Sequence, residues 1–213
     1  MGDFFEFMSA SDLLQAKETF HNQYVSSGVA QIAGKSNEDT FSIYEHEHQA
    51  IAFGVFDGHG GSYGSSICSE SFCKGCLATA DSMIQDFKAY NHFTDNTTLE
   101  VETYDAFLCE SVRQEAAAIS DEMQQQGNSG TTCNALFIKV IGENSIRLYC
   151  ANVGDSRSLL IRDDSILYLS EDHVLSLPRE LKRIKQRKVA KWFPLPADPF
   201  SSAVMEVIFG AVE

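Results

Sequence analysis

The sequence predicts an α+β fold in which antiparallel sheets are combined with helices grouped in blocks. Three observations lead to this prediction: strand-like runs follow one another across short turns, one apolar run suits a central strand, and one clear amphipathic helix interrupts the strands. Strands adjacent in sequence favour antiparallel pairing, because a parallel pair needs a long crossover connection. With 213 residues, 44% of them hydrophobic, the chain can bury a sizeable core.

The first elements come from a polar N-terminal part. We expect residues 1–24 to form a leader, residues 25–31 a first strand and residues 34–36 a turn. From position 37 onward we expect a second strand, in which Asp39 lies on the same face as Phe41 and Ile43. This alternation predicts that Asp39 points toward the core.

A near-continuous apolar run at residues 50–56 predicts a central strand covered on both faces, and it ends at Asp57. After a glycine-rich loop, Ser62 could cap a helix that runs toward Leu77. The polar residues that follow, as far as Thr98, have the composition of turns.

The next helix is marked by apolar residues at spacings of three and four, which form one stripe. The residues of this stripe are Leu108, Val112, Ala116, Ile119 and Met123. We interpret the stripe as core. The helix should end near residues 127–130, where glycine, asparagine and serine gather.

The second half of the chain reads as a series of strands. They are expected at residues 131–141, 146–153, 158–162 and 166–169, with residues 142–144 and 154–155 as hairpin turns.

The charge and composition exclude several classes of protein. A formal net charge of -14 argues against a nucleic-acid partner, since acidic surfaces repel phosphate backbones. No apolar stretch has the roughly 18 residues of a membrane span, and the N-terminus lacks the pattern of a signal peptide. We therefore expect a cytoplasmic protein, with the nucleus as the alternative. Basic residues crowd positions 179–191, either as an anion-binding or localisation patch or, as we favour, as a solvated helix face.

The six cysteines are scattered, and only Cys73 and Cys76 have the spacing of a metal or redox pair. A second pair of ligands is missing from the sequence. We favour reduced, partly buried thiols over a zinc site.

The strongest chemical signal is the pentad at residues 57–61, Asp-Gly-His-Gly-Gly, at the mouth of a buried strand. Asp57 supplies a hard oxygen ligand, and Gly58 lets a backbone carbonyl turn toward the same ion. His59 follows, and it can donate a proton near neutral pH. The next two glycines allow an anion to approach the start of the following helix. The pattern predicts a site that holds Mg²⁺ or Mn²⁺ against a phosphate; the alternative is a plain Asp-Gly turn with a surface histidine.

Further acids are needed for a site with two metal ions. Asp39 is the best second ligand, while Glu38 points the other way on a regular strand and reaches a metal only through water or a bulge. Asp155 sits in a Gly-Asp turn that could equally be a simple hairpin.

Five segments, taken in order, resemble the metal-dependent protein serine/threonine phosphatases of type 2C, also called PPM. They are residues 37–39, 54–61, 129–132, 151–157 and 169–173, and the second and fourth are the most specific. The resemblance extends from about residue 27 to about residue 184. It implies two antiparallel sheets packed face to face as a sandwich with flanking helices (α-β-β-α). It also implies that residues 25–188 are the N-terminal portion of such a domain, whose C-terminal part is missing, and that 189–213 are a divergent tail.

The resemblance also implies a reaction and its residues. Asp57 would bridge two Mg²⁺ or Mn²⁺ ions, with the carbonyl of Gly58 on one of them. Glu38 and Asp39 would hold metal-bound waters, and Asp155 would help to bind a third ion. Metal-activated water would attack the phosphorus of phosphoserine or phosphothreonine in protein substrates, and His59 would protonate the leaving oxygen.

Two features depart from the family pattern. Gly34 stands where the family carries a phosphate-binding arginine, and the adjacent Lys35 lacks the bidentate fork of arginine. The downstream segments that supply further metal aspartates are also absent. We therefore expect a phosphatase first, a pseudophosphatase that binds phosphoproteins without turnover second, and a different metal phosphohydrolase or an interaction fragment last. Without the downstream part, apolar sheet edges should be exposed unless a partner covers them.

Overall fold

The computed structural model describes residues 14–21, 25–31, 37–46, 50–93, 101–126, 129–142, 145–163, 165–186 and 205–208. The chain divides into two compact units, residues 1–38 and 39–213. In the first unit, strand β1 (Leu14–His21) pairs antiparallel with β2 (Ser26–Gln31). β2 confirms the expected first strand. β1 lies where we expected a polar leader, and its polar residues gave no strand signal. The expected turn at residues 34–36 lies outside the described residues.

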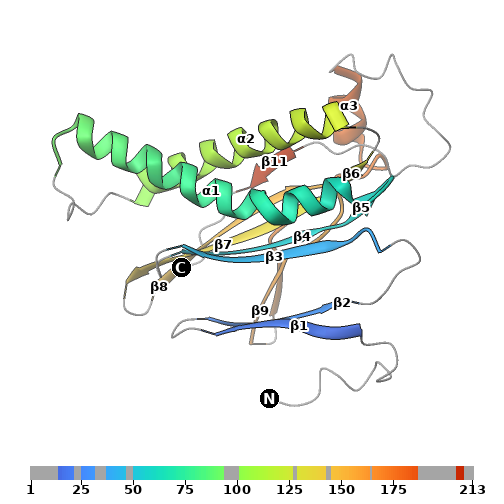
Figure 1. Cartoon of the computed structure of the whole chain (residues 1–213), viewed down its shortest axis with the longest axis horizontal. Helices are drawn as coiled ribbons and strands as arrows, with labels where there is room; N and C mark the ends of the chain where they lie inside the picture. The colour runs from blue at the N-terminus through green and yellow to red at the C-terminus, as the bar shows by residue number, and fades with distance from the viewer. Residues whose placement is uncertain are drawn as a thin grey trace. The chain divides into compact units, whose positions relative to one another are not determined.

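The second unit is built on a five-stranded antiparallel sheet with the order β11-β8-β7-β4-β3 (Figure 1). Its strands are β3 (Thr40–His46), β4 (Ala50–Phe56), β7 (Cys133–Gly142), β8 (Ser145–Val153) and β11 (Met205–Ile208). β4 lies between β3 and β7, as its apolar run predicted. The antiparallel sheet and the helices confirm the α+β class, whereas the face-to-face packing of two sheets stays a prediction.

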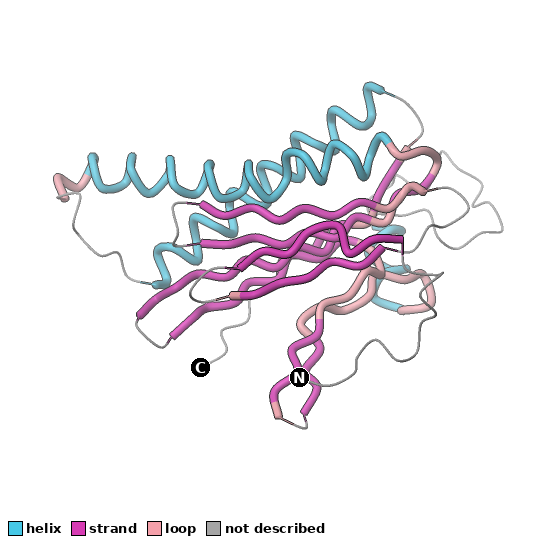
Figure 2. Tube along the Cα trace, turned by 60° about the horizontal axis from the view of Figure 1, so that its bottom comes forward, coloured by secondary structure: helices cyan, strands magenta, loops and turns pink. Residues whose placement is uncertain are grey.

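Two long helices, α1 (Tyr63–Tyr90) and α2 (Val101–Gln126), lie side by side along one face of this sheet (Figure 2). The apolar stripe of α2 is confirmed, because Leu108 and Val112 are fully buried and Ile119 is 5% exposed. α1 runs to Tyr90, well beyond Leu77, so the prediction of turns in this stretch was wrong. Apolar residues continue at spacings of three and four after Leu77, at Ala80, Ile84 and Phe87, and this helical signal was overlooked.

The core of the second unit lies between the helix pair and the sheet. Leu77, Val112, Phe56 and Phe137 meet there with little or no exposure. Each such side chain contributes roughly 1.5–3 kcal/mol by leaving water. The helix-facing residues of β3 include Thr40, whose hydroxyl donates to the carbonyl of Ser65 at 2.8 Å. The face of β3 that contacts α1 is thus the one with Thr40, and not the face with Phe41 and Ile43 that we expected to point toward the core.

The remaining elements are a hairpin and a short helix. β9 (Leu159–Arg162) pairs with β10 (Ser165–Tyr168), and α3 spans Pro178–Gln186. Several large apolar side chains of the hairpin are exposed: Leu159, Ile161, Ile166, Leu167 and Tyr168. This agrees with the expectation of exposed apolar surface. At the edge of the five-stranded sheet, however, β11 of the same chain pairs with β8. Within the described residues, no helix is both long and apolar enough to cross a membrane.

Candidate metal and phosphate site

Asp57 stands at a break in a long ladder between two segments of the chain. β5 (Gly58–His59) pairs with β6 (Gly130–Thr131), and Gly58 lies opposite Thr131. In the preceding ladder between β4 and β7, Val55 lies opposite Asn134, so the two ladders have the same register. Asp57 and Thr132 therefore face each other between the two paired stretches. The amide of Thr132 donates to the carbonyl of Asp57 at 2.8 Å, which anchors the start of the pentad.

Two of the other predicted acids, Asp39 and Asp155, lie within electrostatic reach of Asp57. The pKa of Asp57 is raised above its usual value, first by partial burial, then by the charge of Asp39 and a hydrogen bond with it, and also by the charge of Asp155. The charge of His59 acts in the opposite direction. The carboxylates of Asp39 and Asp155 thus add negative charge beside Asp57. A hard divalent cation would relieve it, so the donor chemistry fits Mg²⁺ or Mn²⁺.

The acids are neighbours without forming a finished coordination shell. Among the residues that the structure describes, no group of three or more His, Cys, Asp or Glu side chains is close enough to hold an ion. Asp39 is exposed and directly precedes β3, so the expectation that it points toward the core was wrong. Being exposed leaves Asp39 accessible at the surface where Asp57 is also exposed. Glu38 is half-buried and ends the first compact unit, and its part in metal binding stays a prediction.

The loop after Asp57 has the backbone that its glycines predicted. Gly60 and Gly61 have φ values of 70° and 117°, a region that side chains disfavour. His59 is exposed, and its imidazole lies against Gly130 on the neighbouring strand. The loop thus fixes the backbone of a solvent-accessible histidine two residues after Asp57.

The start of α1 is capped from a distant part of the chain. Ser62 occupies the N-cap position, but its side chain makes no capping hydrogen bond. Instead, the amide of Gly64 donates to Oγ of Ser129 at 2.6 Å. The expected serine cap was therefore assigned to the wrong residue, and one amide that we expected to face an anion already has a partner.

The second acidic loop, around Asp155, is not the hairpin turn that its Gly-Asp sequence suggested. β8 pairs with β7 and β11, whereas β9 pairs with β10, so the strands on either side of the loop belong to different sheets. Gly154, with φ of 94°, instead pairs with His173: the amide of His173 donates to the carbonyl of Gly154 at 2.9 Å. The amide of Gly154 donates in return to Nδ1 of His173 at 3.3 Å.

Two buried asparagines support this loop, and sequence reasoning missed both. The side-chain amide of Asn152, which is fully buried, donates to the carbonyl of Glu171 at 2.9 Å and to that of Gly154 at 3.2 Å. Its Oδ1 accepts a hydrogen bond from Asn134 at 2.7 Å. The available signal was an asparagine within each of two apolar strands, because a buried amide needs partners.

A charged pair, Arg157 and Asp172, connects the same loop to the segment that contains His173. Nε of Arg157 donates to Oδ1 of Asp172 at 2.7 Å, and a second hydrogen bond joins Nη2 to Oδ2. These bonds hold the pKa of Asp172 below its usual value. The segments at residues 151–157 and 169–173, which the sequence singled out separately, thus form one structural unit around Asp155.

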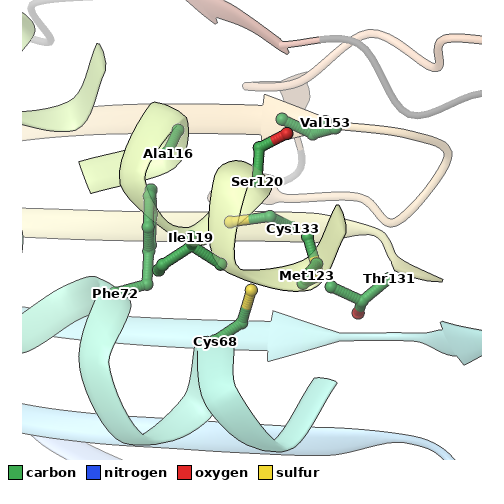
Figure 3. Close-up of a pocket in the computed structure, with 9 residues that line it drawn as sticks. All are labelled: Cys68, Phe72, Ala116, Ile119, Ser120, Met123, Thr131, Cys133 and Val153. Carbon is green, nitrogen blue, oxygen red and sulfur yellow. The ribbon is translucent and has the colours of Figure 1, made fainter. Parts of the chain in front are cut away.

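A separate cavity of about 130 Å³ lies between the two long helices and the sheet (Figure 3). It is lined by Cys68, Phe72, Ala116, Ile119, Ser120, Met123, Thr131, Cys133 and Val153. None of the predicted acids is among these residues. Burial raises the pKa of Cys68 to about 12 and that of Cys133 well above its usual value, so both thiols stay neutral. The cavity is an apolar space of the core.

All six cysteines are free thiols, and Cys73 and Cys76 are buried in α1. Five of the thiols are buried and Cys109 is half-buried, which agrees with the expected burial. Their reduced state stays a prediction. The basic segment is described as far as residue 186, where Arg179 pairs with Glu171 and Arg183 with Glu180. Lys182 is exposed, as a solvated helix face predicts, and residues 187–191 lie outside the described part.

Known proteins are similar to this chain in sequence and in fold. The family model described as Protein phosphatase 2C matches residues 19–190. Protein phosphatase 1L of Bos taurus is 30% identical over 189 residues, which cover 82% of this chain and 47% of the relative. Probable protein phosphatase 2C 52 of Oryza sativa is 29% identical over 168 residues, covering 76% of this chain and 30% of the relative. The chain thus spans less than half the length of these relatives.

Two solved structures share the fold. Serine-threonine phosphatase 2C from Toxoplasma gondii gives a TM-score of 0.51 at 16% identity, over 72% of this chain and 51% of that chain. A sex determining protein of C. elegans gives a TM-score of 0.52 at 19% identity, over 72% of this chain and 35% of that chain. Because the family model matches well over half of its residues, this chain belongs to the protein phosphatase 2C family.

Proposed function

We propose that this chain carries the N-terminal part of the active site of a metal-dependent protein serine/threonine phosphatase. Its substrates would be proteins that carry phosphoserine or phosphothreonine. The observation that supports this proposal best is the proximity of Asp39 and Asp155 to Asp57, whose pKa they help to raise beside an exposed histidine. Membership of the protein phosphatase 2C family supports the same reaction class.

Five residues would hold the metal ions. Asp57 and the carbonyl of Gly58 would be direct ligands of Mg²⁺ or Mn²⁺, and Glu38 and Asp39 would hold the ions through water. Asp155 would help to bind a third ion. When bound, the ions would acidify water and neutralise charge that develops on the phosphoryl group.

His59 would act as the general acid. Its imidazole is exposed, so a substrate can reach it, and the ladder between β5 and β6 fixes its backbone two residues from Asp57. It would donate a proton to the serine or threonine oxygen as the bond to phosphorus breaks. Lys35, which the sequence offers in place of the family's arginine, lies outside the described residues.

The experiment compares the wild-type protein with two variants that each remove one carboxylate charge. Asp57→Asn removes the central acid, and Asp121→Asn makes the same change at an exposed position on α2. With Mn²⁺ and either an aryl phosphate or a phosphothreonine peptide, wild type and Asp121→Asn should hydrolyse the substrate at similar rates. Asp57→Asn should be at least about 100-fold slower, since each residue that acts directly in catalysis supplies a large factor. Equal rates for all three proteins would exclude this active site, and peptide binding without turnover would identify a pseudophosphatase.

Three expectations from the sequence stay predictions: the cytoplasmic location, the division of the chain at residues 24 and 188, and the lack of a nucleic-acid partner. The acidic balance of the whole chain supports the last of these.

A further inference from the structure

At the break in the ladder opposite Asp57, the side-chain oxygen of Thr132 takes the place of its own backbone carbonyl as a hydrogen-bond acceptor. In an antiparallel ladder, hydrogen-bonded pairs alternate with non-hydrogen-bonded pairs, and the two residues of a hydrogen-bonded pair exchange both of their backbone hydrogen bonds. Here the amide of Thr132 donates to the carbonyl of Asp57, but the amide of Asp57 donates to the side-chain Oγ1 of Thr132 at 3.0 Å. The carbonyl of Thr132 therefore does not bond to the amide of Asp57. It accepts a hydrogen bond from the hydroxyl of Thr131 at 2.8 Å. The side chain of Thr132 thus takes part directly in holding Asp57.

The same hydroxyl also reaches the second acidic loop. Oγ1 of Thr132 lies 2.6 Å from Oγ of Ser156, the residue that follows Asp155. Because this oxygen accepts from Asp57, its own proton can be donated to Ser156. One oxygen atom therefore joins the backbone of one metal-binding loop to a side chain of the other.

The methyl group of Thr132 is constrained as well. A β-carbon on Gly154 would come within 2.7 Å of Cγ2 of Thr132, so the methyl group and the glycine backbone are in close contact. Thr132 is half-buried in this position. Both branches of the side chain are thus used, the hydroxyl toward Asp57 and Ser156 and the methyl toward Gly154.

We propose that Thr132 is a positioning residue that fixes the separation between Asp57 and Asp155, and thereby sets the affinity of the site for divalent cations. This inference rests on the proposed function, because it assumes that the two acids bind metal. Its physical reason is that residues behind the ligands commonly control metal affinity by holding the ligands in place. Thr132 itself touches neither the substrate nor the metal in this proposal.

The test uses two substitutions of Thr132 and one matched control. Thr132→Val keeps the shape and removes the hydroxyl, whereas Thr132→Ser keeps the hydroxyl. Thr79→Val removes a comparable hydroxyl bond between the two long helices, where Oγ1 of Thr79 donates to Glu115 at 2.7 Å. Calorimetric titration with Mn²⁺ should give about 10- to 100-fold weaker binding for Thr132→Val, the range usual for such supporting residues. Thr132→Ser and Thr79→Val should bind like the wild type.

A second measurement tests the bridge without metal. In amide hydrogen exchange, the amide of Asp57 should exchange at least about tenfold faster in Thr132→Val, since it loses its acceptor, and at the wild-type rate in Thr79→Val. Wild-type Mn²⁺ affinity in Thr132→Val, or an equal loss in both valine variants, would overturn the proposal. If the wild-type protein binds no Mn²⁺, the metal part falls together with the proposed function. In that case, an unchanged exchange rate of the Asp57 amide in Thr132→Val would also contradict the hydrogen bond from Thr132, whereas a faster rate would support it.

Discussion

The imidazole of His59 lies so close to the backbone of Gly130 that a β-carbon at position 130 would come within 2.4 Å of its Nε2 atom. The two residues also face each other in the short ladder between β5 and β6. Gly130, 71 positions later in the sequence, therefore leaves the space that the ring of the proposed general acid occupies, and a side chain there would move the ring.

The first prediction follows from this contact. Gly130→Ala should displace the imidazole and lower kcat by about 10- to 100-fold, because a shift of about 1 Å in a catalytic group can cost a factor of 100. Mn²⁺ affinity should not change. Gly75→Ala is the matched control, since its β-carbon would come equally close, within 2.4 Å, to the end of the Glu115 side chain, away from the site. Full activity in Gly130→Ala would show that the position of the ring does not matter.

The second prediction concerns the crowding of acids around Asp57. Its pKa is raised mainly by partial burial and by Asp39, so the ionised form is disfavoured in the folded protein. Such a group stabilises the fold below its usual pKa, and that contribution is lost as the pH rises through the raised value. Asp57→Asn should therefore stabilise the metal-free protein at neutral pH, by at most about 1 kcal/mol, because solvent screens charges at an exposed position.

The measurement is thermal unfolding with a chelator and with Mn²⁺, and Asp121→Asn serves as the control. Mn²⁺ should raise the Tm of the wild-type protein and of Asp121→Asn, because a ligand of the folded state stabilises it, but not that of Asp57→Asn. A metal-free Asp57→Asn protein less stable than wild type would contradict the interpretation of the site as strained by like charges.

Features that leave a pattern in neighbouring residues could be predicted from the sequence, whereas contacts between distant residues could not. The strand β4 and the apolar stripe of α2 were recognisable because burial leaves a regular pattern along the chain itself. The loop at Asp155 was misread, since a Gly-Asp pair shows a turn but not which strand follows in which sheet. The bonds from Ser129 to Gly64 and from Thr132 to Asp57 span 65 and 75 residues, and no local pattern encodes them. Residues 129–132 stood out in the sequence as a segment, but the contacts that Ser129 and Thr132 make with the start of α1 and with Asp57 are seen only in the structure. The metal-binding roles of the acids stay predictions.

The third prediction concerns the ion pair in α3 between the buried Glu180 and the half-buried Arg183. Glu180 is 3% exposed, and the hydrogen bond from Arg183 is the main reason that its pKa lies below the usual 4.5. A carboxyl with a lowered pKa stabilises the fold above its usual value, and this stability is lost as the pH falls through the lowered value. Glu180→Gln should therefore cost roughly 1.5–3 kcal/mol at pH 7, the range for hydrogen bonds to charged groups.

Urea unfolding at several pH values checks this prediction, with Glu70→Gln at an exposed position of α1 as the control. The difference between wild type and Glu180→Gln should shrink as the pH falls below about 4.5, because the wild-type glutamate becomes protonated. A difference that does not depend on pH would mean that Glu180 acts through packing alone.

The fourth prediction concerns the apolar cavity between the long helices and the sheet. Ala116 lines this space of about 130 Å³, so the three additional carbons of leucine can enter it without displacing the backbone. Ala116→Leu should raise the free energy of unfolding by about 1 kcal/mol, since cavity filling commonly adds this much. Ala117→Leu places the same side chain at the exposed neighbouring position and should leave stability nearly unchanged. Urea unfolding separates the two, and a loss of stability in Ala116→Leu alone would mean that the helix pair cannot accommodate the larger side chain, as in overpacked cores.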